Sequence, residues 1–309
     1  MSAPVASTRT LVVALLANLG IAISKFIAAA ITGSSAMLTE GVHSVVDSVN
    51  QLLLMWGRRA AKRPPDRLHP FGYGRELYFW SFVVAVLVFS VGAGVSVYEG
   101  IVHILHPEPA VSPIIAYAVL LIAFALEGWS TIEAYRDFKE AKGRLGWFEA
   151  VRRSKDPPGF IVLLENGAAM AGIVAAAIGL MLSQLTGNPF FDGAASVLIG
   201  IILGFTAALL AFESKGLLIG EAADPELVTS LRDFADDVQG VVGVGYVLTV
   251  HSSPDQVTVM MNVDFRNDLP ASEVERIVCH IEEEARRRWP QVHRLFVRPM
   301  EGAAKQLQY

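Results

Sequence analysis

The stretch TEGVHSVVDSVNQLLLMWG, which covers residues 39–57, has the length of a membrane helix but carries four strongly polar side chains. They are Glu40, His43, Asp47 and Asn50, at successive spacings of three, four and three residues. Because an α-helix has 3.6 residues per turn, these spacings place all four on one face. Ionisable groups are costly inside a bilayer, so a stripe of them that faces a protein interior indicates a functional site.

His43 and Asp47 lie one helical turn apart and offer an imidazole nitrogen and a carboxylate oxygen. This combination suits zinc and other divalent first-row metal ions. Two ligands from one helix cannot complete a tetrahedral site, so further ligands must come from elsewhere. The comparable interruption is VLLENGAAMAG, where Glu165 and Asn166 lie among small residues that allow another helix to approach. We predict a metal site between the two segments; the competing interpretation is that His43 and Asp47 only hydrogen-bond neighbouring helices.

Three other polar residues in apolar surroundings are given structural interpretations. Glu40 is expected near the outer end of its helix, where water reaches it. Asn50 is expected to bond a neighbouring helix, for example at Asn18. Lys25 can either extend its ammonium group along its stem towards water or pair with an acid.

The composition indicates that these residues belong to a membrane protein. Of the 309 residues, 53% are hydrophobic and only 18% are charged, and the mean hydropathy is +0.45, well above that of an average soluble domain. About 20 apolar residues cross a bilayer core. Six apolar runs meet this length, at roughly 11–31, 36–56, 77–105, 114–135, 159–182 and 189–212. We therefore predict a polytopic α-helical membrane domain of six transmembrane helices over residues 1–213.

Basic residues predict the orientation, because Lys and Arg next to membrane helices stay in the cytoplasm. The connections after the second and fourth runs hold Arg58, Arg59, Lys62, Arg63, Arg67, Arg75, Arg136, Lys139, Lys142, Arg144, Arg152, Arg153 and Lys155. The connections around TGSS, HPEPAVSP and SQLTGNP hold none. With an even number of spans, both ends of the chain are expected in the cytoplasm. The basic loops are explained by topology rather than by nucleic acid, and the start of the chain is too short for a signal peptide.

Residues 214–309 have the composition of a separate cytoplasmic α+β domain. Asp224 can cap a helix that runs to about Val238. GVGYVLTVHS and QVTVMMNVDF then read as a β-hairpin, PASEVERIVCHIEEEARRRW as an amphipathic helix and HRLFVRPM as a last strand. The order helix, strand, strand, helix, strand predicts a ferredoxin-like αββαβ domain. Cys279 is the single cysteine, which excludes an intrachain disulfide and a multi-cysteine metal site.

Several motifs resemble the cation diffusion facilitators, the family of zinc-transporter-type divalent cation/proton antiporters. EGVHSVVDSVNQ resembles the family's His-x-x-x-Asp signature, and PPDRLHPFGYGRE, LLENGAAMAG and ESKGLLIGEAADPE are similar to the branch that includes mitochondrial zinc-transporter-like members. The resemblance covers nearly the whole chain. It implies a secondary active transporter that exports a divalent cation, zinc above all, from the cytoplasm in exchange for protons. It also implies a homodimer formed through the C-terminal domain.

The family takes two ligands from its second helix and two from its fifth. By resemblance His43 and Asp47 are the first pair, and the second falls on Glu165, Asn166 or both, because Val162 stands where many members have a ligand. A second site in some members follows the second helix. Here Asp66 and His69 are present but Tyr73 replaces the last histidine, so this site is expected to be weak or absent.

Other functions remain as alternatives. A mixed nitrogen and oxygen site does not choose among zinc, manganese, iron, cobalt and nickel, and a metal-sensing membrane scaffold would transport nothing. An intramembrane metalloenzyme would need a general base and an open metal position, but the sequence has no His-Glu-x-x-His motif. We expect no enzymatic activity, no prosthetic group, and the metal, protons and lipid as partners. The numerous alanines and short connections suggest the inner membrane of a bacterium, with a mitochondrial membrane as the alternative.

Overall fold

The computed structural model of the chain describes residues 8–107, 113–142, 146–147, 150 and 157–302. They form two compact units, each described by itself. The first unit holds the described residues up to Arg59 together with Phe79–Ser214. The second holds Ala60–Tyr78 and the residues from Lys215 onwards. The division predicted at residue 213 differs from this one because it places residues 60–78 with the membrane helices.

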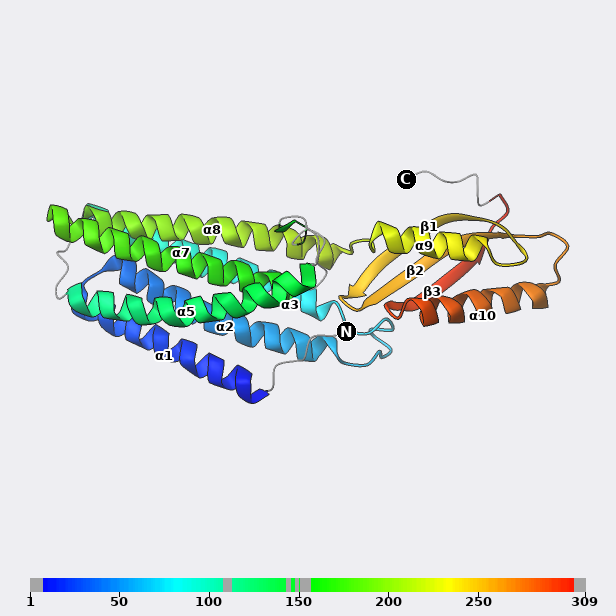
Figure 1. The fold of residues 1–309 in the computed structure, drawn as a ribbon, viewed down its shortest axis with the longest axis horizontal. Helices are drawn as coiled ribbons and strands as arrows, with labels where there is room; N and C mark the ends of the chain where they lie inside the picture. The colour runs from blue at the N-terminus through cyan, green and yellow to red at the C-terminus, as the bar shows by residue number, and fades with distance from the viewer. Residues whose placement is uncertain (1–7, 108–112, 143–145, 148–149, 151–156, 303–309) are drawn as a thin grey trace. The chain divides into compact units, whose positions relative to one another are not determined.

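The first unit is a bundle in which α1, α2, α5, α7 and α8 run lengthwise beside one another (Figure 1). Its elements are α1 (Thr8–Thr32), α2 (Ser35–Ala61), α3 (Glu76–Leu87), the π-helix η1 (Val88–Ala93), α4 (Gly94–Leu105), α5 (Pro113–Lys142), α7 (Pro157–Thr186) and α8 (Phe190–Ile219). Since α3, η1 and α4 follow one another without a gap, they form one long helix with a π-helical segment at its middle.

Several helices have the length and composition of membrane spans. Within the described residues four qualify, at Glu76–Leu105, Ile114–Lys139, Phe160–Thr186 and Phe190–Ile219. α1 adds a shorter apolar segment, Asn18–Thr32. α2 is 27 residues long, but its polar stripe lowers its mean hydropathy. The prediction of apolar membrane helices is confirmed, and the count of six remains a prediction.

Small residues let the helices of this bundle approach closely. A Cβ added to Gly100 of α4 would lie 2.7 Å from the carbonyl oxygen of Gly193 of α8, and one added to Gly193 would lie 2.9 Å from that of Gly100. α7 packs along α5, and α5 packs along α1. Between α1 and α2 the chain turns at Gly33, whose φ of 68° lies in the left-handed region that favours glycine. α2 therefore begins immediately after α1 ends.

The second unit is a three-stranded sheet with two helices. Its elements are α9 (Pro225–Asp236), β1 (Val241–Ser253), β2 (Gln256–Phe265), α10 (Ala271–Arg288) and β3 (Val292–Pro299). The strand order is β1-β2-β3, with β1 antiparallel and β3 parallel to β2. α10 makes the crossover that a parallel pair requires. The predicted cap of α9 is confirmed, since the Asp224 side chain accepts a hydrogen bond from Glu226 N at 2.9 Å.

The helices cover one face of this sheet, and alternate residues of β2 point into the core between them. Val257, Val259, Met261 and Val263 are buried there with Leu231 of α9 and Ile281 of α10. Residues 60–78 attach to β3. Arg294 donates a hydrogen bond to Pro70 O at 2.8 Å and lies over the ring of Phe71 at 4.9 Å. This attachment explains why the segment groups with the second unit.

Candidate metal-transport site

The polar stripe of α2 faces the interior of the bundle. Glu40 and Asn50 have no exposed surface and His43 has 1%, whereas the Asp47 side chain retains 15%. Apolar residues occupy the other side of the helix and are exposed, among them Val45, Val49, Leu52 and Trp56. A helix with this distribution turns its ionisable groups towards protein and its apolar groups towards lipid.

His43 and Asp47 present atoms that could bind a metal ion. His43 Nδ1 lies 3.5 Å from Asp47 Oδ1. Both ring nitrogens of His43, and Asp47 Oδ1, are buried without a hydrogen-bond partner in the described part of the chain. Buried polar atoms are nearly always hydrogen-bonded. These three nitrogen and oxygen atoms lie within one helical turn and lack a hydrogen-bond partner, so each needs a further partner. A metal cation suits all three, because each atom can act as a metal ligand.

Glu165 connects this stripe to α7. Its side chain is buried, and its Oε1 accepts a hydrogen bond from Asn50 Nδ2 at 2.8 Å. It also interacts electrostatically with Asp47. Asn50 thus bonds a neighbouring helix as expected, but its partner is Glu165 rather than Asn18. The structure thus brings Glu165 of α7 close to Asp47 and Asn50 of α2, and His43 lies one helical turn from Asp47.

Asn166 points in another direction. Its Nδ2 donates a hydrogen bond to Ser130 Oγ of α5 at 3.0 Å. Neighbouring residues on a helix are separated by about 100° of rotation, which is why Glu165 meets α2 while Asn166 meets α5. Among the described residues no three His, Cys, Asp or Glu side chains come together as a group that could hold a metal ion.

Glu127 of α5 is a further acid near this region that the sequence analysis did not identify. It interacts electrostatically with Asp47, Lys25 and His43. A signal was available, because Glu127 is a carboxylate inside the fourth apolar run, and ionisable residues within a membrane span usually have a function.

Comparison with known proteins identifies the family. Residues 11–219 match the cation efflux transmembrane domain. The chain belongs to the cation diffusion facilitator family. This match confirms the resemblance found in the motifs. Members of the family are transporters rather than enzymes.

Several relatives are similar over most of this chain. It is 35% identical over 244 residues to the mitochondrial proton-coupled zinc antiporter SLC30A9 of Xenopus laevis, covering 78% of this chain and 44% of that protein. It is 34% identical over 205 residues to metal tolerance protein C4 of Arabidopsis thaliana, covering 66% of this chain and 45% of that protein. It is 24% identical over 270 residues to magnetosome protein MamB of Magnetospira sp. (strain QH-2), covering 84% of this chain and 85% of that protein. The chain spans less than half the length of the first two relatives.

In this cation diffusion facilitator a buried ion pair lies one turn from His43. Lys25 Nζ of α1 lies 3.0 Å from Glu40 Oε2 and donates a hydrogen bond to Ser44 Oγ at 2.9 Å. The expectation that water reaches Glu40 is wrong, because the side chain has no exposed surface. Of the two alternatives for Lys25, the structure shows the pairing with an acid.

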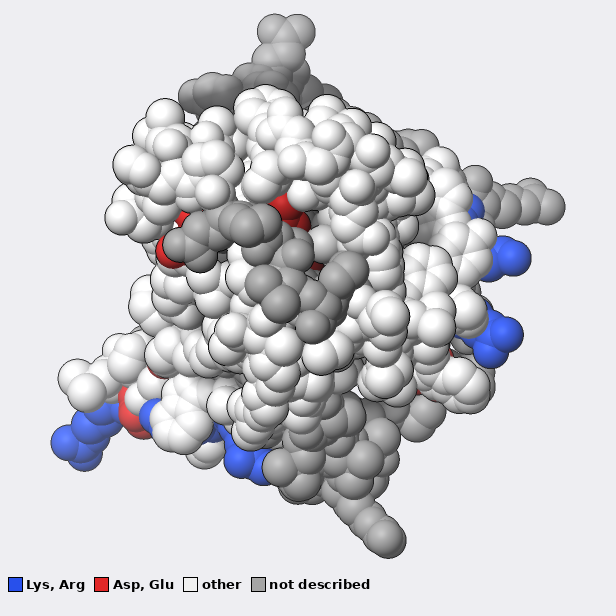
Figure 2. Space-filling view, turned by 90° about the vertical axis from the view of Figure 1, so that its left-hand side faces the viewer, with Lys and Arg blue, Asp and Glu red and all other residues white. Residues whose placement is uncertain are grey.

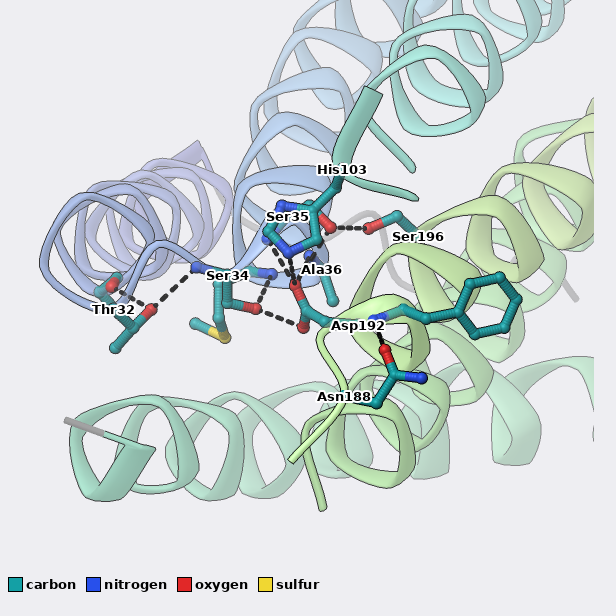
Figure 3. A network of polar contacts seen from close by, with 11 residues as sticks. Thr32, Ser34, Ser35, Ala36, His103, Asn188, Asp192 and Ser196 are labelled. Atoms are coloured by element: carbon teal, nitrogen blue, oxygen red, sulfur yellow. Dashed lines mark hydrogen bonds and ion pairs between the residues drawn. The ribbon is translucent and has the colours of Figure 1, made fainter. Parts of the chain in front are cut away.

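A second polar network holds the start of α2 (Figure 3). The carboxylate of Asp192 in α8 accepts hydrogen bonds from Ser34 Oγ and Ser35 N, each at 2.7 Å, from Ser35 Oγ at 3.1 Å and from Ala36 N at 3.4 Å. His103 Nε2 of α4 lies 3.7 Å from Asp192 Oδ2. An acid at a helix N-terminus satisfies free backbone N–H groups and complements the helix dipole. Asp192 therefore fixes α2 to α8 at the end from which the polar stripe begins.

The bundle end that carries this network shows few charges on its surface. Figure 2 views that end, and uncharged residues dominate it, with acidic atoms between them and Lys and Arg visible only towards the edge of the view. This agrees with the absence of Lys and Arg from the connections around TGSS and SQLTGNP.

Proposed function

We propose that this protein exports a divalent cation, with zinc as the favoured substrate, from the cytoplasm in exchange for protons. The observation that carries the proposal is the pair of unpartnered, buried ring nitrogens of His43 beside Asp47. The names of two relatives, a proton-coupled zinc antiporter and a metal tolerance protein, point to the same substrate class. In this proposal the ligands are His43, Asp47 and Glu165, with Asn166 as the alternative on α7.

Exchange follows from the chemistry of these groups. A nitrogen or carboxylate that binds metal must first lose its proton, so metal and protons compete for the same atoms. Histidine is suited to this competition because its ordinary pKa of about 6.5 lies within the physiological range. The site loads metal when it opens to the cytoplasm, and protons displace the metal when it opens outwards. We propose that α2 and α7 close around the cation, because each helix supplies part of the proposed ligand set.

The remaining features of the proposal concern the whole chain. We propose six membrane spans, with α1 and α2 added to the four apolar spans, and a ferredoxin-like C-terminal domain that mediates a homodimer. Both termini lie in the cytoplasm, and the protein lies in the inner membrane of a bacterium. Each of these proposals follows from the basic connections, from the order of elements, from the composition of the chain or from the family resemblance.

Flux measurements test the proposal. The purified protein is reconstituted in vesicles, and uptake of zinc is followed with and without a pH gradient. We expect zinc uptake that depends on the gradient, and loss of uptake in Asp47→Ala. Manganese, iron, cobalt and nickel are compared in the same assay, so that a carrier for another cation is recognised by its preferred ion.

Two outcomes would contradict the proposal. Absence of flux for every ion from folded protein would favour a metal-sensing scaffold. Uptake by Asp47→Ala equal to that of the unmodified protein would exclude the site on α2. Size-exclusion chromatography of the variant shows whether it is folded and keeps the oligomeric state of the unmodified protein.

A further inference from the structure

The ion pair between Lys25 and Glu40 is fully enclosed by the bundle. Neither side chain has exposed surface. The ammonium group is held by two residues one turn apart on α2, Glu40 at 3.0 Å and Ser44 at 2.9 Å. A lysine in such a position cannot extend its charge to the membrane surface. It is fixed between α1 and α2.

The second oxygen of Glu40 is free of hydrogen bonds within the described residues. Oε1 is buried without a partner and lies against Gly172 of α7, where an added Cβ would overlap with it. Glu40 is also only three residues from His43 on the same face of α2. A carboxylate with a free oxygen next to a candidate metal ligand could itself join the metal site. The contact with Lys25 is the feature that opposes this role.

Charge explains what that contact does. Around the candidate site lie Lys25 on α1, Glu40, His43 and Asp47 on α2, Glu127 on α5 and Glu165 on α7. Lys25 is the one permanent cation among these groups, and it cancels one of the four carboxylates. A buried charge without a partner is far more costly than a buried pair, so the contact between Lys25 and Glu40 stabilises both side chains inside the bundle.

We propose that Lys25 is a built-in counter-ion that keeps Glu40 ionised and outside the coordination of the transported cation. Resting on the proposed function, this role makes Lys25 a positioning residue. It determines how many carboxylates face the cation, and therefore how many protons leave the protein when the cation binds.

The proposal predicts distinct behaviour for three variants. In Lys25→Met the buried Glu40 has no counter-ion and takes up a proton, which an arriving cation expels. In Glu40→Gln the ammonium group loses its partner and repels the cation, so zinc affinity falls roughly tenfold or more. In Lys25→Met combined with Glu40→Gln both charges are absent, and the candidate ligands on α2 and α7 are untouched.

The experiment counts protons and measures affinity on the purified full-length protein. Zinc is titrated into weakly buffered protein with a pH indicator, and affinity is measured by calorimetry. Lys25→Met should release about one more proton per zinc than the unmodified protein. The double variant should return to the unmodified proton count and affinity, and Lys25→Arg should keep both.

Each outcome is decisive. If Lys25→Met releases as many protons per zinc as the unmodified protein, the ion pair between Lys25 and Glu40 is structural only and the proposal fails. If the double variant binds zinc as weakly as Glu40→Gln, then Glu40 is a ligand rather than a neutralised acid, and the proposal also fails. This second comparison uses only Glu40→Gln and the double variant, so it can still be made if Lys25→Met alone does not fold. Unmodified protein that binds no zinc would contradict the proposed function itself, which separates the two failures.

Discussion

Glu165 and Asn166 are neighbours in the chain but lie in different surroundings. Glu165 is buried against Asn50 and interacts with Asp47, whereas Asn166 bonds Ser130 of α5. Only Glu165 can add a negative charge to the interface with α2. The arrangement therefore favours Glu165 over Asn166 as the ligand that α7 supplies.

Substitutions at these two positions should have unequal effects. We expect Glu165→Gln to lower zinc uptake at least tenfold, because it removes a negative charge that a divalent cation needs. Asn166→Ala should lower uptake less than threefold, since it removes one hydrogen bond to α5. Initial rates of zinc uptake into vesicles, at equal amounts of reconstituted protein, provide the comparison. A larger loss in Asn166→Ala would mean that the ligand on α7 is misassigned.

Spacing alone predicts part of this site. The pattern of three, four and three residues correctly places Glu40, His43, Asp47 and Asn50 on one face of α2. It does not reveal which residues of other helices they meet, because the rotation of each helix depends on tertiary packing. For that reason the approach of Glu127 is not predicted, and the sequence leaves open whether Lys25 reaches water or pairs with an acid.

The position of α2 depends on Asp192. Its carboxylate satisfies donors of Ser34, Ser35 and Ala36 at the start of the helix. His43 lies eight residues beyond Ser35, about 12 Å along the axis at 1.5 Å per residue. A shift or rotation at the capped end is thus passed along a short rigid helix to the candidate ligands.

Asp192→Ala should destabilise the protein and weaken transport together. Loss of the carboxylate leaves several buried donors without an acceptor, which costs about 2–3 kcal/mol. Asp192→Asn is the matched control, since asparagine also caps helices and should cost about 1 kcal/mol. Thermal unfolding in detergent ranks the variants. Equal melting temperatures for Asp192→Ala and the unmodified protein would show that the network does not hold α2.

The loop after α2 contains a second arrangement of acid and aromatic groups. Tyr73 OH donates a hydrogen bond to Asp66 Oδ2 at 2.7 Å, while Leu68 N and His69 N donate to Asp66 Oδ1. The bond from Tyr73, followed by that from His69 N, lowers the pKa of Asp66 below its ordinary value of 3.8. Tyr73 thus uses the carboxylate oxygen that a metal would need at this position.

The pKa of Asp66 should report this contact. The pKa of Asp66 is lower in the folded loop than in an unfolded chain. At a pH above the unfolded-state pKa, the ionised carboxylate therefore stabilises the folded loop. That contribution disappears as the pH falls through the folded-state pKa. In Tyr73→Phe we expect the pKa of Asp66 to rise. NMR titration of carbon-13-labelled aspartate, with the signal assigned by Asp66→Asn, measures the shift. An unchanged pKa in Tyr73→Phe would contradict the role of the tyrosine.

Local sequence patterns predict the helices and strands of the second unit, but they do not predict its contacts between residues far apart in the sequence. The cap at Asp224 and the order of helices and strands follow from residues close together in sequence. The bond from Arg294 to Pro70 joins residues 224 positions apart. No local pattern reports a contact of that kind, so it could not be predicted from the sequence.

The distribution of basic residues over the chain predicts which side of the membrane each connection occupies. Lys and Arg are concentrated after α2 and around the end of α5, and are absent from the connections around TGSS and SQLTGNP. Under the positive-inside rule we expect the second unit, with α9 and α10, to lie in the cytoplasm.

Cys279 allows a direct test of that orientation. It is the only cysteine of the chain and is exposed on α10. A maleimide that cannot cross membranes should label it in inverted vesicles and in detergent, but not in intact spheroplasts, because the reagent reaches only the side to which it is added. Cys279→Ser is the control for labelling of other proteins. Labelling in intact spheroplasts would place α10 outside, and zinc export from the cytoplasm would then need the opposite arrangement of the whole bundle.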